Sequence, residues 1–390
     1  MGREFDAIVV GSGLGGLVAG ALWAADGKRV LVLERNATFG GAAGTFTIGP
    51  LTVEGSLHEL DGLDSGDPKL SFLDRLGLRE AVDFVDVGDL YEVRSARLGE
   101  PFVFPHGLVE AREAVARRFP GQASASERWF DLVDRLRTAL GLAILKQDDR
   151  GWWLRSLPRL PGLFLPFVRH APSSTGGVMR RLFGDDEAVK IAVAANMQYF
   201  GDDPSRLWFP FFAVAQGSYY RGGGHYVRGG SSRLVEALVA RITSAGGSVE
   251  NRRLVTRISL DHGRVSAVEH EAAPEGGDAM RERAPVIFGN ASPHALAKML
   301  PPERARSFMR RYDQRPGDGR GLYQHRPFRV AYCHQSCCWD LRRAEIIGSI
   351  IGLSGLAVGS FHSTRRSSQT YRHGCWFWCH SGQVFVINRA

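Results

Sequence analysis

A glycine-rich turn near the N-terminus constrains this chain more than any other stretch. Residues 7–10, AIVV, form a short apolar run of the kind that fills a buried parallel strand. The glycines that follow have G-x-G-x-x-G spacing. This spacing allows a tight turn, close approach of the backbone to a pyrophosphate, and close packing of the next helix on the strand. We therefore predict a dinucleotide-binding loop formed by Gly11, Ser12, Gly13, Gly15 and Gly16.

The residues after the turn complete a strand–helix–strand unit. Apolar residues recur with helical spacing between residues 14 and 25, Gly27 ends the helix, and residues 29–33 have the composition of a second buried strand. Glu34 closes that strand 23 residues after Gly11, where an acid accepts a hydrogen bond from a ribose hydroxyl. Because a carboxylate repels a 2′-phosphate, this site favours FAD or NAD over NADP. The alternative is a structural glycine turn without a ligand.

Two neighbouring glycines help to choose between FAD and NAD. With Gly40 and Gly41, the stretch 6–41 resembles the N-terminal signature of glutathione-reductase-type flavoproteins, in which a Gly-Gly pair passes close to FAD. Residues 41–46, 53–69 and 222–238 are similar to the phytoene desaturase, carotenoid isomerase and retinol saturase branch. The resemblance implies FAD, bound by the loop glycines and Ser12 together with Glu34, Arg35, Gly40, Gly41 and the backbone of Val255.

The resemblance also implies the domain organisation. We expect an α/β fold in which a Rossmann-like FAD-binding domain, a parallel sheet plus a β-meander, carries an inserted α+β substrate domain. The FAD-binding domain is expected at residues 1–60 and 222–300, and the inserted substrate or lid domain at 61–221. Residues 301–330 would return to the substrate domain, and residues 331–390 form an atypical tail.

Local signals predict several helix ends. Asp67 followed by Pro68 is typical of an N-cap and a first helical residue. A helix over residues 185–199 should be capped by one of its first two aspartates, Asp185 or Asp186, and Ser231 or Ser232 should cap the helix that follows the second glycine-rich stretch. Residues 248–271 contain three strand-like runs that would form the meander.

Residues 151–172, GWWLRSLPRLPGLFLPFVRHAP, have an unusual composition. The prolines exclude one long regular helix. Tryptophans with nearby arginines are typical of a membrane–water interface, so one interpretation is a surface that enters lipid and admits an apolar substrate. The other interpretation is a proline-broken segment of the core.

The stretch 208–220, WFPFFAVAQGSYY, is densely aromatic. In an enzyme for polyenes such residues would line a long apolar tunnel; elsewhere they would belong to the core. Our candidates for contact with substrate are Tyr219 and Tyr220, together with His58, which lies downstream of the Gly-Gly pair. His58 has the alternative of being a structural histidine.

The tail has a different character from the rest. All five cysteines and four of the twelve histidines lie beyond residue 328, and there is no lysine there. The third FAD segment that the resemblance implies is not found. The favoured interpretation is an out-of-frame or truncated end. The alternatives are a zinc module, for which the spacing departs from C-x-x-C, and simple buried cysteines. We assign no metal site.

The net charge of +8 and the pI near 9.5 come largely from arginine, since the chain has only five lysines. Such a balance could favour an anionic membrane or nucleic acid. No nucleic-acid motif is found, so we exclude nucleic acid as a partner. No signal peptide and no apolar run of the ~18 residues needed to span a bilayer is found. We expect a cytoplasmic location, with peripheral contact at the inner face of the membrane through residues 151–172.

The resemblance implies a FAD-dependent oxidoreductase that transfers hydride between flavin and an apolar polyene or long-chain substrate. The reaction could be a desaturation, a saturation or an isomerisation. A flavin amine oxidase-like enzyme with a polar amine substrate is one alternative. A truncated, non-catalytic remnant is another, because the third FAD segment is missing. No catalytic acid–base pair follows from the sequence.

Overall fold

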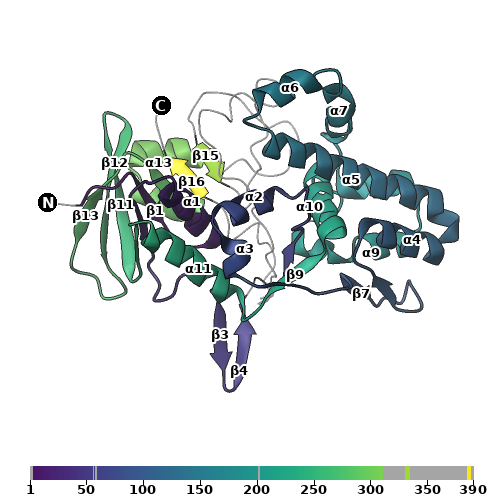
Figure 1. The fold of residues 1–390 in the computed structure, drawn as a ribbon, viewed down its shortest axis with the longest axis horizontal. Helices are drawn as coiled ribbons and strands as arrows, with labels where there is room; N and C mark the ends of the chain where they lie inside the picture. Colours follow the sequence, from purple (N-terminus) through teal and green to yellow (C-terminus); the bar gives the residue numbers. More distant parts are fainter. Residues whose placement is uncertain are drawn as a thin grey trace.

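The computed structural model describes residues 3–55, 57, 59–200, 203–310, 330–333 and 384–387. Figure 1 shows two groups of elements: a mixed sheet-and-helix part around strand β1 and helix α1, and a mainly helical part around the long helix α5. Within the described residues, no helix combines the length and the apolar character needed to cross a bilayer.

The central sheet has six strands. Its order is β10-β2-β1-β14-β16-β15, and β10, β2, β1 and β14 run parallel to one another. β16 pairs with β14 in the antiparallel sense, and β15 pairs with β16. This confirms the predicted α/β class with a parallel sheet. The strands are β1 (Ala7–Val10), β2 (Val30–Leu33), β10 (Ser248–Glu250), β14 (Ile287–Gly289), β15 (Val330–Cys333) and β16 (Val384–Ile387).

Both faces of this sheet are covered, which explains why β1 and β2 are apolar throughout. Successive strand side chains point to opposite faces. Val9 and Val32 lie in a core with helices α1 (Leu14–Ala25) and α11 (Ser231–Ser244), whereas Ile8 and Leu31 lie in a second core on the other face. Because a strand buried on both faces has no side chains in contact with solvent, its sequence is apolar throughout and does not alternate between apolar and polar residues.

The second face of the sheet is covered by an antiparallel meander. β11 (Arg253–Asp261), β12 (Arg264–Ala272) and β13 (Met280–Arg283) form an antiparallel sheet of their own. The register shifts between Val255 and Arg257, as in a β-bulge. Helices α12 (Pro293–Met299) and α13 (Pro302–Met309) follow β14 and contribute apolar side chains to the same core.

The sequence predicted two strands of this meander correctly, β11 and β12. The run at 248–250 was wrongly assigned to it: as β10 it pairs in the parallel sense with β2 in the central sheet. The error arises because a local strand signal does not say which sheet a strand joins. The third meander strand, β13, was not predicted.

The helical part has its own core, in which aromatic rings pack against one another. Trp129 of α5 lies 5.9 Å from Phe212 of α10, measured between ring centroids, and both side chains are fully buried. The helices are α4 (Leu108–Arg118), α5 (Ala123–Leu145), α6 (Arg150–Ser156), α7 (Leu160–His170), α8 (Thr175–Phe183), α9 (Glu187–Val193) and α10 (Phe209–Gly222), with 3-10 turns η1 (Pro120–Gln122) and η2 (Ala195–Phe200).

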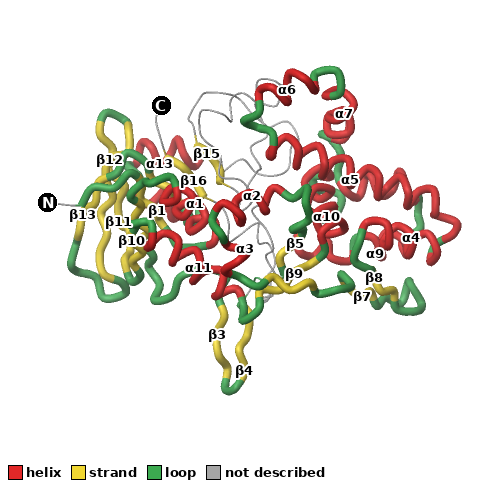
Figure 2. Tube along the Cα trace, viewed as in Figure 1, coloured by secondary structure: helices red, strands yellow, loops and turns green. Residues whose placement is uncertain are grey.

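Smaller elements lie between and beside the two parts (Figure 2). A three-stranded sheet has the order β5-β9-β6, and the hairpin β3–β4 projects from the body. Helices α2 and α3 pack with α1 and α11 in the first core. The elements are β3 (Thr45–Ile48), β4 (Leu51–Glu54), β5 (Leu60–Asp61), α2 (Pro68–Arg75), α3 (Leu78–Ala81), β6 (Phe84–Asp86), β7 (Tyr91–Val93), β8 (Phe102–Phe104) and β9 (Gly224–Val227). The domain boundaries from the sequence stay predictions.

Two of the predicted helix caps are confirmed and one is wrong. Asp67 caps α2 by accepting a hydrogen bond from the Lys69 N–H, and Asp186 caps α9. The N-cap of α11 is Gly230, not a serine. Its first N–H groups are free to meet Glu54 of β4 instead, and the Ser231 N–H donates to Glu54 Oε2 at 2.8 Å. The carboxylate accepts a hydrogen bond from a free N–H, as a serine cap would, and its negative charge is also favourable at a helix N-terminus.

The predicted helix over 185–199 is interrupted. Helix α9 ends at Val193, and a 3-10 turn follows. The residues at the break have no local signal for it. The interruption therefore comes from packing, since Val193 is fully buried and its carbonyl accepts a 2.7 Å hydrogen bond from the Tyr220 hydroxyl of α10.

A buried histidine ties the meander together. His270 of β12 is 1% exposed, and its Nδ1 accepts a 2.8 Å hydrogen bond from Arg253 Nε of β11. Its Nε2 lies 3.9 Å from Glu282 Oε1 of β13. Burial, together with the positive charge of Arg253, lowers the pKa of His270 despite the nearby Glu282. The folded protein therefore disfavours protonation of this imidazole.

We expect the free energy of unfolding to fall as the pH drops below about 6.5, the pKa of an unfolded-chain histidine. The unfolded chain takes up a proton at residue 270 at a higher pH than the folded chain does, so protonation favours unfolding. Denaturant titrations between pH 7.5 and 5 should show a shallower pH dependence for His270→Gln. His262→Gln is the control, because that side chain is exposed. An unchanged slope in His270→Gln would contradict this assignment.

Candidate functional site

The glycine-rich turn lies where β1 ends between its two neighbours. The Gly11 N–H donates to the Leu33 carbonyl of β2 at 2.8 Å. Gly11 has a φ of +97°, and a Cβ built on it would lie 2.4 Å from the carbonyl oxygen of Asn290, just after β14. A side chain is therefore excluded at Gly11 by backbone conformation and by the neighbouring strand.

The third glycine of the motif brings the helix onto the strand. A Cβ on Gly16 would lie 2.4 Å from the Gly11 carbonyl oxygen and 3.0 Å from the Asn290 side chain. Helix α1 can therefore begin at Leu14, directly beyond the turn, with Gly13 as its N-cap. The first turn of an α-helix has N–H groups without intrahelical partners and a partial positive charge, which together bind phosphate.

The Gly-Gly pair passes the mouth of the same turn. Gly40 pairs with Gly13 in a parallel β-bridge, and the Gly40 N–H donates to the Ser12 carbonyl at 3.0 Å. Gly40 and Gly41 have φ values of +103° and +63°, and a Cβ on Gly41 would lie 3.1 Å from the Gly13 Cα. The structure thus brings the two glycine motifs, 27 residues apart, into backbone contact.

Glu34 is held in place at the end of β2. Its Oε2 accepts hydrogen bonds from the Ser12 N–H and the Ser12 hydroxyl, both at 2.8 Å, and its Oε1 accepts one from the Asn36 N–H at 2.9 Å. The side chain is 5% exposed. Three donors thus fix the orientation of the carboxylate at the edge of the turn, the position where an acid contacts a ribose.

The remaining predicted cofactor residues lie nearby with different exposure. Arg35 follows Glu34 and is exposed. Val255 is buried in the core between the central sheet and the meander. This core also contains Val10 and Leu33, the last residues of β1 and β2. Val255 pairs with β12 just before the register shift of β11, so the residue that follows it has no partner in the ladder register.

An apolar pocket lies beside α1, and its lining includes a buried lysine and a buried aspartate. Lys69 Nζ is 2.8 Å from Asp67 Oδ2 and 3.4 Å from Asp61 Oδ2, and all three side chains are buried. Burial would lower the pKa of Lys69, but the two carboxylates outweigh it and hold that pKa above its ordinary value. The pocket is lined by Leu14, Val18, Leu57, Leu60, Asp61, Lys69, Phe72, Leu73, Leu78, Leu234 and Leu238.

The two candidate substrate tyrosines have different surroundings. Tyr220 is fully buried, stacks on Phe104 at 5.2 Å between ring centroids, and donates its hydroxyl proton to the Val193 carbonyl. Burial raises its pKa. Tyr219 is half-buried at the junction of the two parts, and its hydroxyl donates to Glu59. His58 lies outside the described residues.

The stretch 151–172 forms the short helices α6 and α7 joined by a turn, as its prolines predict. Leu154 and Leu165 are 69% and 61% exposed. Trp153 is half-buried: its Nε1 donates to the Lys146 carbonyl, and its ring stacks on Phe164 at 6.3 Å between centroids. The segment therefore combines an exposed leucine surface with an aromatic contact that joins its two helices.

The cysteine-rich tail is not tested. Cys333 ends β15, and the side chains of that strand are not among those described; the other four cysteines lie outside the described residues. The out-of-frame, zinc and buried-cysteine interpretations stay predictions. In the described part of the chain, no three His, Cys, Asp or Glu side chains are grouped to hold a metal ion.

One residue of the site was missed by sequence reasoning. The Asn290 Nδ2 donates to the Gly11 carbonyl at 3.3 Å, and the Asn290 N–H donates to the Val10 carbonyl at 2.7 Å. The sequence shows only an Asn-Ala turn after a buried strand. The signal that could have revealed it is the strand order, which places the end of β14 beside the end of β1.

Comparisons with known proteins agree with this geometry. The model of an NAD(P)-binding Rossmann-like domain matches residues 9–76. An oxidoreductase from Methanosarcina mazei has a similar fold, with a TM-score of 0.55 and 17% identity over 80% of this chain and 65% of that one. The chain has the fold of FAD/NAD(P)-binding oxidoreductases.

Three kinds of curated enzyme match the sequence. The all-trans-retinol 13,14-reductase of Rattus norvegicus is 28% identical over 78% of this chain and 50% of its own length. Prolycopene isomerase 1 of an Oncidium hybrid cultivar is 24% identical over 68% and 46%. The neurosporene-forming phytoene desaturase of Cereibacter sphaeroides is 26% identical over 67% and 49%. The chain is a distant homologue of these enzymes. It spans about half the length of these relatives.

The glycine geometry makes a prediction that needs no cofactor. We expect Gly16→Ala to lower the free energy of unfolding by about 1–3 kcal/mol, because a methyl group would press on backbone at the start of α1. Gly162→Ala in α7 is the matched control: no atom lies within 4 Å of its added Cβ, so it should be neutral or stabilise by up to ~1 kcal/mol. Urea denaturation measures both, and equal effects would refute the packing argument.

Proposed function

We propose that this chain is a FAD-dependent oxidoreductase, or the corresponding part of one, that acts on an apolar polyene or long-chain substrate. The observation that carries the proposal is the homology to retinol reductases, prolycopene isomerases and phytoene desaturases, on a chain whose dinucleotide site has the necessary parts. Prolycopene, phytoene and retinol, named in those enzymes, are apolar isoprenoids. The homology thus supports the substrate class.

The residues present fit the adenosine diphosphate part of FAD. The cradle formed by Gly11, Gly16 and Gly41 has no room for side chains, so a pyrophosphate could meet backbone there. The first turn of α1 supplies N–H donors and partial positive charge, and Glu34 supplies a carboxylate acceptor for ribose hydroxyls. Because a 2′-phosphate would be repelled by Glu34, this arrangement favours FAD over an NADP-type ligand.

Flavin supplies hydride transfer, chemistry that side chains alone cannot carry out. The task of the chain's own residues is to bind, orient and exclude water. Helix α10 places Tyr219 at the junction between the dinucleotide-binding part and the helical part, and Glu59, the residue before strand β5, lies beside it. With Tyr220 locked in the helical core, Tyr219 is the tyrosine of this pair that could contact a substrate at the junction.

The function is tested by reconstitution and turnover. We expect the purified chain to retain FAD, seen as protein-bound flavin absorption after gel filtration, and Glu34→Ala to weaken FAD binding by about tenfold or more. Under anaerobic conditions, retinoid or carotenoid substrates should change the flavin oxidation state or be isomerised. Peroxide release on addition of amines would instead support an amine oxidase. Retained FAD with no reaction on any substrate would support a non-catalytic remnant.

We also propose that the leucine surface of α6 and α7 contacts lipid, which would bring the protein to an apolar substrate dissolved in a membrane. Leu154, Leu157, Leu165 and Val168 are each more than half exposed. Arginines flank them in the sequence, as on segments that lie at a membrane surface. In Figure 1, this helix pair lies at the top of the molecule and the hairpin β3–β4 at the bottom, so the two exposed apolar surfaces are well separated.

We expect the double variant Leu154→Gln/Leu165→Gln to bind vesicles of anionic phospholipid about tenfold more weakly, because two exposed leucines would no longer leave water. Flotation on sucrose gradients measures the bound fraction. The double variant Ile48→Gln/Leu51→Gln in the hairpin is the matched control, since these side chains are 57% and 63% exposed. If only the hairpin variant loses binding, the lipid surface has been assigned to the wrong end of the molecule.

A further inference from the structure

Asn290 holds the glycine-rich turn from the side opposite to Glu34. In the sheet, β2 lies on one side of β1 and β14 on the other. The Gly11 N–H is bonded to the Leu33 carbonyl at the β2 side, and the Gly11 carbonyl accepts from the Asn290 amide at the β14 side. Both hydrogen-bonding groups of this one glycine are therefore fixed by neighbouring strands.

The Asn290 side chain also forms a wall for the first turn of α1. Its Cβ and Nδ2 each lie 3.0 Å from the position that a Cβ on Gly16 would take. Its own backbone N–H continues the β1–β14 pairing through the Val10 carbonyl at 2.7 Å. The side chain thus lies between the turn that enters α1 and the helix itself, and its amide is aimed at the turn.

We propose that Asn290 is a positioning residue of the dinucleotide site, which keeps the turn and the start of α1 in the geometry that receives a pyrophosphate. This inference rests on the proposed FAD site. Without the amide, the Gly11 carbonyl loses its side-chain partner and the wall beside Gly16 is removed. The turn can then move relative to the helix, and the N–H groups of the first turn no longer converge on one point.

This role separates phosphate binding from ribose binding. Asn290 acts from the β14 side on Gly11 and Gly16, whereas Ser12 and Asn36 hold Glu34 at the β2 side. Loss of the Asn290 amide should therefore weaken ligands that carry the pyrophosphate. It should leave the recognition of the ribose unchanged. A purely structural asparagine would weaken both alike.

The test is competition against FAD, followed by flavin fluorescence, with ADP and adenosine as the probes and the whole chain as the protein. We expect Asn290→Ala to weaken the binding of ADP about tenfold, because one hydrogen bond to the turn and the side-chain contact beside Gly16 are lost. The affinity for adenosine should change by no more than about twofold. Asn290→Asp keeps the size of the side chain but replaces the donor with a negative charge. It should weaken ADP further, and it serves as the test if the alanine variant does not fold.

Two control variants should give different patterns of ADP and adenosine binding. Ser12→Ala removes a donor to Glu34, so it should weaken ADP and adenosine equally. Gln122→Ala removes a similar amide-to-carbonyl hydrogen bond in the helical part and should change neither. Equal losses of ADP and adenosine in Asn290→Ala, or no loss of either, would overturn the proposal. If the unmodified chain binds neither FAD nor ADP, both this inference and the proposed function fail; if it binds both but has no turnover, only the proposed function fails.

Discussion

The close approach of helix α1 to the end of strand β1 is the contact on which the rest of the site depends. It requires that Gly11 and Gly16 carry no side chain, because each would place a Cβ 2.4 Å from a backbone oxygen. The turn is short, and the hydrogen bonds that fix it come from outside it. The Gly11 N–H donates to β2, and the Gly11 carbonyl accepts from Asn290, the residue after β14. A cofactor site formed mainly by backbone is thus defined by the order of strands in the sheet.

That dependence explains which parts the sequence could predict. The unit β1–α1–β2 was predicted within a residue or two because its signals are local: two apolar runs, a glycine spacing and an acid at a set distance. The caps at Asp67 and Asp186 were predicted for the same reason. Two strands of the meander, β11 and β12, followed from alternation and turn residues, whereas the run at 248–250 pairs in the central sheet and β13 was not predicted.

The parts that escaped prediction depend on partners far away in the sequence. Glu54, not a serine, meets the start of α11, 177 residues later. The loop of Asp61 and Asp67 has a composition typical of a solvated turn, yet it holds a buried ion pair with Lys69. Asn290 acts on Gly11 across 279 residues. No local pattern distinguishes such residues from ordinary polar ones, because the burial that gives them their role is a property of the packed molecule.

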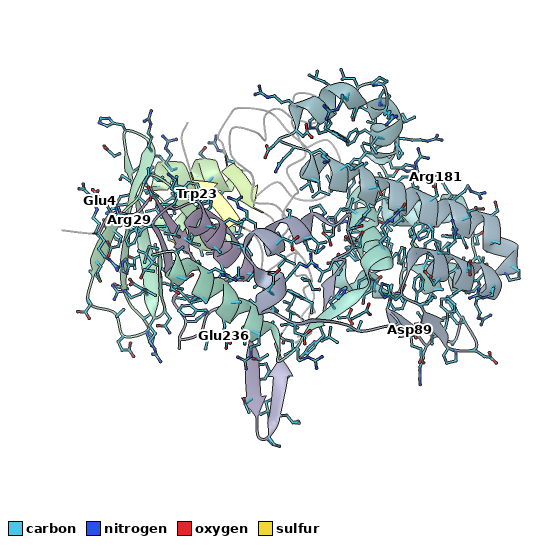
Figure 3. All side chains as sticks on the ribbon, viewed as in Figure 1. Glu4, Trp23, Arg29, Asp89, Arg181 and Glu236 are labelled. Carbon is cyan, nitrogen blue, oxygen red and sulfur yellow. The ribbon has the colours of Figure 1, made fainter. Side chains whose placement is uncertain are left out.

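The junction between the two parts has the same character as the turn, because backbone meets backbone there. A Cβ on Gly222, the last residue of α10, would lie 2.2 Å from the Gly62 carbonyl oxygen after β5. The chain then enters β9, which pairs with both β5 and β6, and continues to α11 beneath the sheet (Figure 3). Contacts of this kind cannot be relaxed by a side-chain rotation. The helical part is therefore joined to the dinucleotide-binding part at a fixed point, and Tyr219 and Glu59 are held beside it.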